Sequence, residues 1–247
     1  MASNRRAKGY AQRAKGSVTV GPHLVAAPAE GLWRLGWATS PLHSLPPQAL
    51  DLAESRAGNR YDPIVPDFEV QYFGTTRAAC YAETLAARRP SPAYADLLRQ
   101  SGEWSTHMGP GTVEAEWRRK RVLTCSLPEQ TNERFLDISH HRSMAWLNAQ
   151  LPSLLVALGF ETITLSEVTQ GDRRLTRSIS SWLHGLKDGE GQPLFDGVRY
   201  PSRYGEDFEC WAVFADRVLM RTLLTQTVEL DDPDLKYVAN LFGLLVF

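Results

Sequence analysis

Three polar residues stand at positions where folding alone does not require them. In the stretch "GVRYPSRYG", Ser202 and Arg203 place a hydroxyl and a guanidinium side by side in a turn after a short strand. A turn residue only needs to bond its own backbone, so the turn does not explain Arg203. Glu83 lies in "ACYAETLAA", on a helix side shared with Ala79 and Ala86 that is typical of a core-facing surface. A carboxylate on such a surface is costly unless it is paired or used in chemistry.

Further polar candidates lie on strands and in one loop: Arg34, Arg60, Tyr61 and Tyr72. Glu83 could form an ion pair with Arg34, Arg60 or Arg203. From the residue types, this structural role for Glu83 and a role in chemistry are equally good interpretations. For Tyr72 and Ser202, a packed aromatic ring and a turn hydroxyl are the simpler interpretations. The residue types alone therefore leave both structural and chemical roles open.

Motifs for several nucleotide and metal sites are absent from the sequence. It has no Walker-type glycine loop, no GxGxxG and no HExxH, so P-loop, Rossmann and zincin classes lose their sequence support. The adjacent His140 and His141 cannot both face one metal from a regular helix, which favours a capping or surface role. Cys80, Cys125 and Cys210 have no ligand-like spacing and are expected in the core. We therefore expect no metal site.

Composition and charge narrow the class of protein. The 247 residues are 43% hydrophobic and 22% charged, with a formal net charge of -1. This balance gives no global reason to expect direct binding to nucleic acid or to an anionic membrane. No run approaches the roughly 18 apolar residues of a membrane span, and an odd number of cysteines argues against a disulfide framework. A cytoplasmic protein is expected, with a disordered basic tail over residues 1–20.

Periodicity predicts a mixture of strands and helices. Strands are expected in "GLWRLGWA", "FEVQYFG", "WRRKRVLTCSLP", "RFLDIS", "CWAVFA", "VLMRTLLTQTVEL" and around 198–200. Helices are expected in "TRAACYAETLAARR", "AYADLLRQ", "RRLTRSISSWLHGL" and "SMAWLNAQLPSLLVALG", the last kinked or broken at Pro152. The irregular order favours the α+β class over regular βαβ winding. We expect one domain over residues 21–247, with an irregular insertion at about 91–111.

The polar candidates follow a familiar order along the chain. Arg34 in "LWRLGW", Glu83 in "YFGTTRAACYAETLA" and Ser202 in "GVRYPSRYGEDFECWAVF" resemble the arginine, glutamate and serine signatures for which the RES domain is named. "GNRYDP", which holds Arg60 and Tyr61, resembles the glycine-arginine-aromatic loop of that family, and "RFLDIS" resembles its mid-domain strand. The similarity spans about residues 31–214, so the chain is identified by resemblance as a member of the RES family.

This resemblance implies a fold and an activity. The fold would be a mixed-sheet core with flanking helices, similar to the catalytic domains of ADP-ribosylating toxins. The activity would consume NAD+ as a substrate, with inorganic phosphate as a co-substrate in some members and no other cofactor. RES proteins resemble toxins that pair with a helix-turn-helix (Xre-type) antitoxin, so the resemblance implies such a partner. Nucleic acid would be bound by the antitoxin and not by this protein directly. The function implied first is an NAD-degrading toxin that cleaves the nicotinamide–ribose bond by hydrolysis or phosphorolysis and so depletes cellular NAD. The alternatives are ADP-ribose transfer to a protein and a catalytically silent module that binds a nucleotide or partner, and a homo-oligomer stays open.

The charged residues suit such chemistry. Cleavage of the nicotinamide–ribose bond passes through an oxocarbenium-like state, so Glu83 would stabilise the developing positive charge. Two phosphates need planar, permanently charged donors, for which Arg34 is the first choice and Arg60 the alternative. Arg203 would help at the phosphates or bind an attacking phosphate.

The remaining candidates are uncharged. Tyr72 would offer a flat face on which nicotinamide stacks. Ser202 would form a hydrogen bond with the ribose or a phosphate. Tyr61 belongs with Arg60 among the expected substrate-binding residues.

Overall fold

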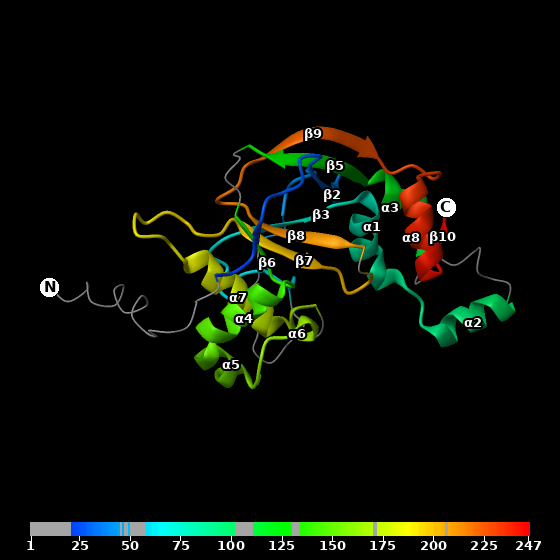
Figure 1. Cartoon of the computed structure of the whole chain (residues 1–247). Coiled ribbons are helices and arrows are strands. Elements are labelled where there is room, and N and C mark those ends of the chain that lie inside the picture. The colour runs from blue at the N-terminus through cyan, green and yellow to red at the C-terminus, as the bar shows by residue number, and fades with distance from the viewer. Residues whose placement is uncertain are drawn as a thin grey trace.

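Alternating side chains build the strands of one large sheet (Figure 1). The computed structural model describes residues 21–44, 46, 49, 58–101, 111–129, 134–169, 172–205 and 207–247. The expected basic tail, 1–20, lies outside this part of the chain. Within it, the main sheet has eight strands in the spatial order β1 (Leu24–Val25), β6 (Phe135–Asp137), β7 (Gly197–Pro201), β8 (Glu209–Phe214), β3 (Val70–Gly74), β2 (Leu32–Trp37), β5 (Arg121–Pro128) and β9 (Met220–Thr227).

The sheet is mixed in direction. Strands β6 and β7 are parallel, whereas the other neighbouring pairs of the main sheet are antiparallel. A separate parallel pair joins β4 (Thr112–Val113) to β10 (Leu245–Val246). In the centre, Gly74 and Tyr200 both lie opposite Cys210 on β8. Because directly opposed residues and residues two apart share a face, Tyr72, Tyr200 and Cys210 project from the same side of the sheet.

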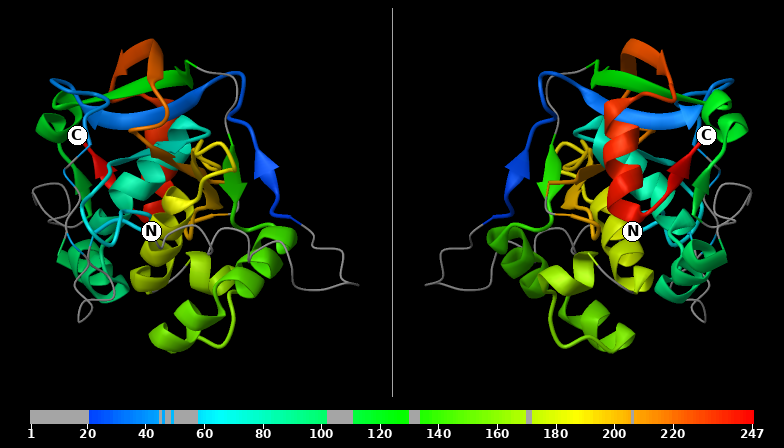
Figure 2. Two further views of the ribbon diagram at one scale, coloured as in Figure 1. Left: turned by 90° about the vertical axis from the view of Figure 1, so that its left-hand side faces the viewer. Right: turned by 90° about the vertical axis from the view of Figure 1, so that its right-hand side faces the viewer.

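Six of the described helices form two groups on that side (Figure 1). One group packs over β6, β7 and β8 around a shared apolar core and comprises α4 (His141–Gln150), α5 (Pro152–Leu158), α6 (Leu165–Thr169) and α7 (Arg173–Gly185). The second group is α1 (Arg77–Leu85) and α8 (Pro233–Phe242), which contact each other while α1 also packs on β2 and β3. Figure 2 shows the two groups from both sides of the fold. The gap between α1 and α7 is where the candidate site lies.

Smaller elements complete the described chain. They are the 3-10 turn η1 (Ala86–Arg88), α2 (Pro92–Ser101) and α3 (Ala115–Arg119). Helix α2 accounts for half of the segment expected to be an irregular insertion, and residues 102–110 lie outside the described residues. Figure 1 shows α2 at the periphery of the fold. None of the described helices is both long and apolar enough to cross a membrane.

The α+β class and the mixed sheet with flanking helices are confirmed. The break at Pro152 is also confirmed, since α4 ends at Gln150 and α5 begins at Pro152. His140 caps α4, because its Nδ1 accepts a hydrogen bond of 3.2 Å from the Arg142 N–H. The strand expected in "WRRKRVLTCSLP" starts late, because its first residues end α3 and only Arg121–Pro128 is extended. Periodicity did not predict α6. The apolar stretch at residues 238–247 contains both the end of α8 and β10.

Candidate active site

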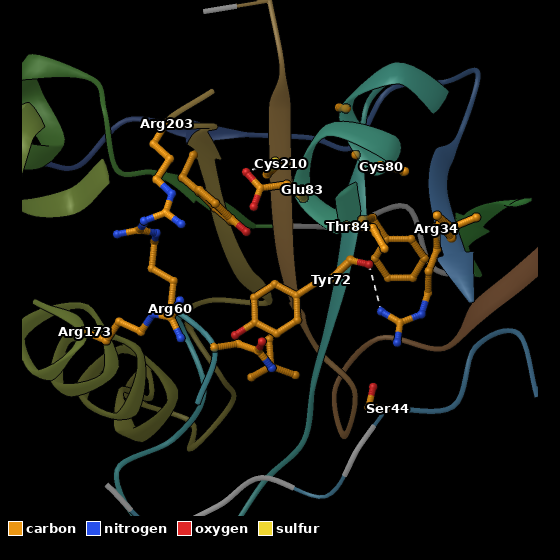
Figure 3. Close-up of a pocket in the computed structure, with 17 residues that line it drawn as sticks. Arg34, Ser44, Arg60, Tyr72, Cys80, Glu83, Thr84, Arg173, Arg203 and Cys210 are labelled. Atoms are coloured by element: carbon orange, nitrogen blue, oxygen red, sulfur yellow. Dashed lines mark hydrogen bonds between the residues drawn. The ribbon is translucent and has the colours of Figure 1, made fainter. Parts of the chain in front are cut away.

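A pocket of about 430 Å³ lies between α1 and α7 over the central strands (Figure 3). This volume is within the range of small-molecule sites. The pocket is lined by strands β2, β3, β7 and β8, by helix α1 and the first turn of α7, and by the loop after β2, the loop before β3 and the turn after β7. Its polar and charged lining side chains include Arg34, Ser44, Asn59, Arg60, Tyr72, Glu83, Thr84, Arg173 and Arg203. The pocket therefore gathers residues from across the sequence.

Glu83 reaches the pocket because α1 packs tightly on β3. Thr76 caps the helix by accepting a hydrogen bond of 3.1 Å from the Ala79 N–H. A Cβ on Gly74 would lie 2.9 Å from the Ala79 Cβ and 3.2 Å from the Cys80 Sγ, so only glycine permits this approach. Ala79 is fully buried, whereas Glu83, one turn later, is exposed toward the pocket. The expectation that Glu83 sits on a core-facing surface was wrong, because that side of α1 becomes a pocket wall.

The carboxylate of Glu83 is held by a serine from the turn after β7. The Ser202 hydroxyl donates a hydrogen bond of 2.6 Å to Glu83 Oε1. Ser202 is itself buried, and its Oγ accepts a hydrogen bond of 3.0 Å from the Tyr204 N–H. The Cys210 thiol lies 3.8 Å from the same Oε1. Thus the hydrogen bonds that Glu83 receives from described side chains come from Ser202 and Cys210, not from an arginine.

Three arginines gather on one side of the pocket. Figure 3 shows Arg60, Arg173 and Arg203 close together there, from the loop before β3, the first turn of α7 and the turn after β7. Burial, together with the positive charges of Arg60 and Arg203, lowers the pKa of Arg173. The Nη1 of Arg60 is buried and has no hydrogen-bond partner among the described residues. A concentration of positive charge with an unsatisfied buried donor favours an anionic ligand.

Arg34 lies on the far side of Tyr72 from these arginines (Figure 3). Its guanidinium donates to the carbonyl oxygens of Pro41 at 3.3 Å, Tyr72 at 2.8 Å and His43 at 3.0 Å. Three of its five N–H groups are therefore used to hold β2, β3 and the loop after β2 together. Burial lowers the pKa of Arg34. Arg34 lines the pocket, but the structure does not bring it into the arginine group.

The two tyrosines have different surroundings. Tyr72 lines the pocket, and its hydroxyl donates to Asp62 Oδ1 at 2.8 Å while it accepts from the Tyr61 N–H at 3.0 Å. Burial and the negative charge of Asp62 raise the pKa of Tyr72 well above its ordinary value. Tyr61 is fully buried, its ring packs on Tyr200, and its hydroxyl donates to the Val168 carbonyl at 3.3 Å. The Tyr61 side chain therefore belongs to the core and not to the pocket lining.

Sequence reasoning overlooked Arg173 and Asp62. Arg173 and Arg177 are four residues apart on α7, a spacing that places both on one side of a helix. Asp62 follows Tyr61 directly in "GNRYDP" and is buried. The helical spacing was a usable signal for Arg173, whereas nothing in the sequence distinguishes a buried aspartate in a loop from an exposed one. In the described part of the chain, no three His, Cys, Asp or Glu side chains gather in a way that could hold a metal ion.

The match to a family model agrees with the resemblance noted above. The sequence model of the RES domain matches residues 31–232. No curated protein matches the chain. A chain of the crystal structure of the M. tuberculosis MbcT-MbcA toxin-antitoxin complex is similar to it at 14% identity, over 89% of this chain and 92% of that chain, with a TM-score of 0.43. Because the RES match covers most of the 247 residues, the protein belongs to the RES domain family.

Proposed function

We propose that this protein is an NAD-degrading enzyme that cleaves the nicotinamide–ribose bond of NAD+, either with water or with inorganic phosphate. The observation that carries this proposal is the arrangement of charge in one pocket. The carboxylate of Glu83, the ring of Tyr72 and a group of three arginines line the same pocket, in a member of the RES family. NAD+ has the complementary pattern, since its diphosphate is anionic and its nicotinamide ribose becomes positive as the bond breaks.

Arg60, Arg173 and Arg203 would bind the diphosphate. Guanidinium groups bind phosphate oxygens in pairs of parallel hydrogen bonds, which fixes the ligand as well as holding it. The buried Nη1 of Arg60, with no partner among the described residues, would gain one from a phosphate oxygen. With phosphate as the second substrate, Arg203 is best placed to bind it, because its side chain is exposed at the pocket wall.

Glu83 would stabilise the oxocarbenium-like state and orient the attacking water or phosphate. In hydrolysis, the C1″–N bond breaks, nicotinamide leaves with the bonding electron pair, and water adds to C1″ and loses a proton. In phosphorolysis, a phosphate oxygen adds instead and the product is ADP-ribose-1″-phosphate. Ser202 would keep Glu83 oriented through the hydrogen bond of 2.6 Å.

Tyr72 and Arg34 would complete the nicotinamide side of the pocket. The Tyr72 hydroxyl is already bonded to Asp62 and to the Tyr61 N–H, so the ring face is what Tyr72 offers to a ligand. Arg34 would position β2, β3 and the adjoining loop through its three carbonyl contacts. We also propose a helix-turn-helix antitoxin as the protein partner, on the basis of membership in the RES family.

A product assay tests the proposal. Purified protein is incubated with NAD+, with and without inorganic phosphate, and the products are identified by mass. Nicotinamide with ADP-ribose indicates hydrolysis, and nicotinamide with ADP-ribose-1″-phosphate, formed only when phosphate is present, indicates phosphorolysis. If the wild-type protein releases no nicotinamide under either condition, the proposed function is wrong, and ADP-ribose transfer to a protein or a silent binding module replaces it.

A further inference from the structure

The segment that carries Arg60 into the pocket, residues 58–64, lies along helix α7 and is bonded to it repeatedly. Its main-chain groups form hydrogen bonds with four side chains of the helix. The carbonyl oxygen of Gly58 accepts from Arg173 Nη1, and that of Tyr61 accepts from Ser180 Oγ at 2.7 Å. The carbonyl oxygen of Pro63 accepts from Arg177 Nη2 at 2.6 Å, and the Ile64 N–H donates to Ser181 Oγ at 2.9 Å. A loop normally satisfies its backbone with water, so this number of side-chain contacts marks a segment held in one conformation.

Asp62 stands at the centre of this segment and bonds in both directions. Its Oδ1 accepts from the Tyr72 hydroxyl at 2.8 Å, and its Oδ2 accepts from the Asn59 N–H at 2.7 Å. The carboxylate therefore ties β3 to the residue that immediately precedes Arg60. Asp62 is only 6% exposed, so its charge must be compensated by hydrogen bonds and a nearby cation.

Arg173 and Arg177 of α7 both lie near enough to Asp62 to interact with its charge, and Arg177 is fully buried. Burial lowers the pKa of Arg177, and the negative charge of Asp62 opposes this by raising it. Gly58 shows how close the two groups lie: a Cβ there would be 2.8 Å from Arg177 Nη1 and 3.3 Å from Asp62 Oδ2. The backbone of Gly58 has a φ of +69°, a conformation that glycine adopts without strain. Asp62 and Arg177 are thus two buried groups of opposite charge that lie close to each other.

We propose that Asp62 is a positioning residue, which with Arg177 holds the 58–64 segment so that the Arg60 guanidinium stays in the pocket. Asp62 is not itself among the residues that line the pocket. It acts through Arg60 and through Tyr72, whose ring it fixes by the hydroxyl bond. The inference rests on the proposed function only in the identity of the ligand, since the contacts that hold the segment are independent of the reaction.

Removal of one member of the pair should loosen the segment. Asp62→Asn keeps the shape of the side chain but removes the negative charge that faces the buried Arg177, and it puts an N–H donor in place of one of the two acceptor oxygens. The 58–64 segment should then open more often, which withdraws Arg60 from the ligand and weakens NAD+ binding more than it slows the chemical step. In Asp62→Asn with Arg177→Met, the positive charge that faces Asp62 is removed as well, so the loss of binding should be smaller than in Asp62→Asn alone.

The test combines a measurement without substrate and one with it. Amide hydrogen exchange of Asn59, Tyr61 and Ile64 is measured in the wild type, in Asp62→Asn, in the double variant and in the control Asp67→Asn, which changes an exposed aspartate in the same loop region. The KM and kcat for NAD+ are measured in the same four proteins. We expect Asp62→Asn to exchange at least about tenfold faster at these amides and to raise KM about tenfold, with kcat changed less than about threefold. The control should match the wild type.

Each outcome bears on the inference. Unchanged exchange and unchanged KM in Asp62→Asn overturn it, and so does an equal loss in the double variant and the single variant. If the exchange behaves as expected but the wild-type protein does not degrade NAD+, the proposed function fails while the positioning role stands. Should Asp62→Asn not fold, Tyr72→Phe removes the same link without changing a charge, and faster exchange at Tyr61 is then required.

Discussion

The Ser202 hydroxyl donates a hydrogen bond of 2.6 Å to Glu83 Oε1 although 119 residues separate them in the chain. One residue comes from a helix and the other from a turn at the end of a strand, and they meet because β3 and β7 both pair with β8. This contact explains why a hydroxyl stands in the turn of "GVRYPSRYG". It also fixes the direction in which the carboxylate faces the pocket.

Replacement of Glu83 with glutamine should abolish most of the NAD+ turnover. The amide has nearly the same shape but no negative charge, so we expect kcat to fall at least about 100-fold. The thermal unfolding midpoint should stay within a few degrees of the wild type, because Glu83 is exposed toward the pocket. Glu161→Gln, which changes another exposed glutamate, is the matched control. Unchanged kcat in Glu83→Gln removes Glu83 from the mechanism.

The variant Ser202→Ala tests whether orientation of the carboxylate matters. It removes the hydrogen bond to Glu83 and also the acceptor for the Tyr204 N–H. A hydrogen bond to a charged group contributes about 1.5–3 kcal/mol, so we expect kcat to fall about tenfold or more, with a smaller change in KM. Steady-state kinetics on NAD+ decide this. A rise in KM alone points instead to direct substrate binding by the hydroxyl.

Arg60→Ala should weaken NAD+ binding about ten- to hundredfold, through loss of charge-assisted hydrogen bonds to the diphosphate. Arg60→Lys should restore little of it, since an ammonium cannot reproduce the planar pair of donors. The dissociation constant is measured by calorimetry in the inactive Glu83→Gln background, with Arg119→Ala on exposed α3 as the control. If Arg60→Ala binds normally while Arg34→Ala does not, the diphosphate lies at Arg34.

Gly58→Ala should destabilise the fold by about 1–3 kcal/mol, because an L side chain is strained at positive φ. The new Cβ would also lie 2.8 Å from Arg177 Nη1. Gly189→Ala is the matched control, since a Cβ there meets nothing within 4 Å, and it should change stability by less than about 0.5 kcal/mol. Urea unfolding measures both. Equal stability of the two variants would show that the 58–64 segment adapts to the side chain.

The helix cap at His140 should make stability depend on pH. Desolvation and the neighbouring His23 and His141 rings lower the pKa of His140 below its ordinary value of 6.5. A lowered histidine pKa means that the unfolded chain binds the proton more readily, so the stabilisation is complete above pH 6.5 and is lost as the pH falls through this value. His140→Asn keeps a good capping residue without this titration. Thermal unfolding between pH 5 and pH 8, at about half-unit steps, should show a shallower acid decline in the variant than in the wild type.

Local patterns predicted a large part of the fold. The strand in "FEVQYFG" and the helix in "TRAACYAETLAARR" were predicted from periodicity, and they are present as β3 and α1. The break at Pro152 was predicted from the missing N–H of proline. By contrast, α6 is only five residues long, too short for helical periodicity to be distinct. The start of the strand before Arg121 was also misjudged, because "WRRKR" suits a helix end as well as a strand.

The sequence by itself determined which functional groups this protein has and in what order: Arg34, Glu83 and Ser202 in the pattern of the RES family. Only the tertiary structure decided which of them meet. Strand register brings Ser202 to Glu83. Helix α7 places Arg173 in the same pocket as Arg60 and Arg203. Arg34 instead donates to backbone carbonyl oxygens, including that of Tyr72. Local sequence patterns indicate the short-range preferences for strand, helix and turn. Which of these side chains meet depends on strand pairing and burial between residues far apart in the chain, and no local pattern encodes that.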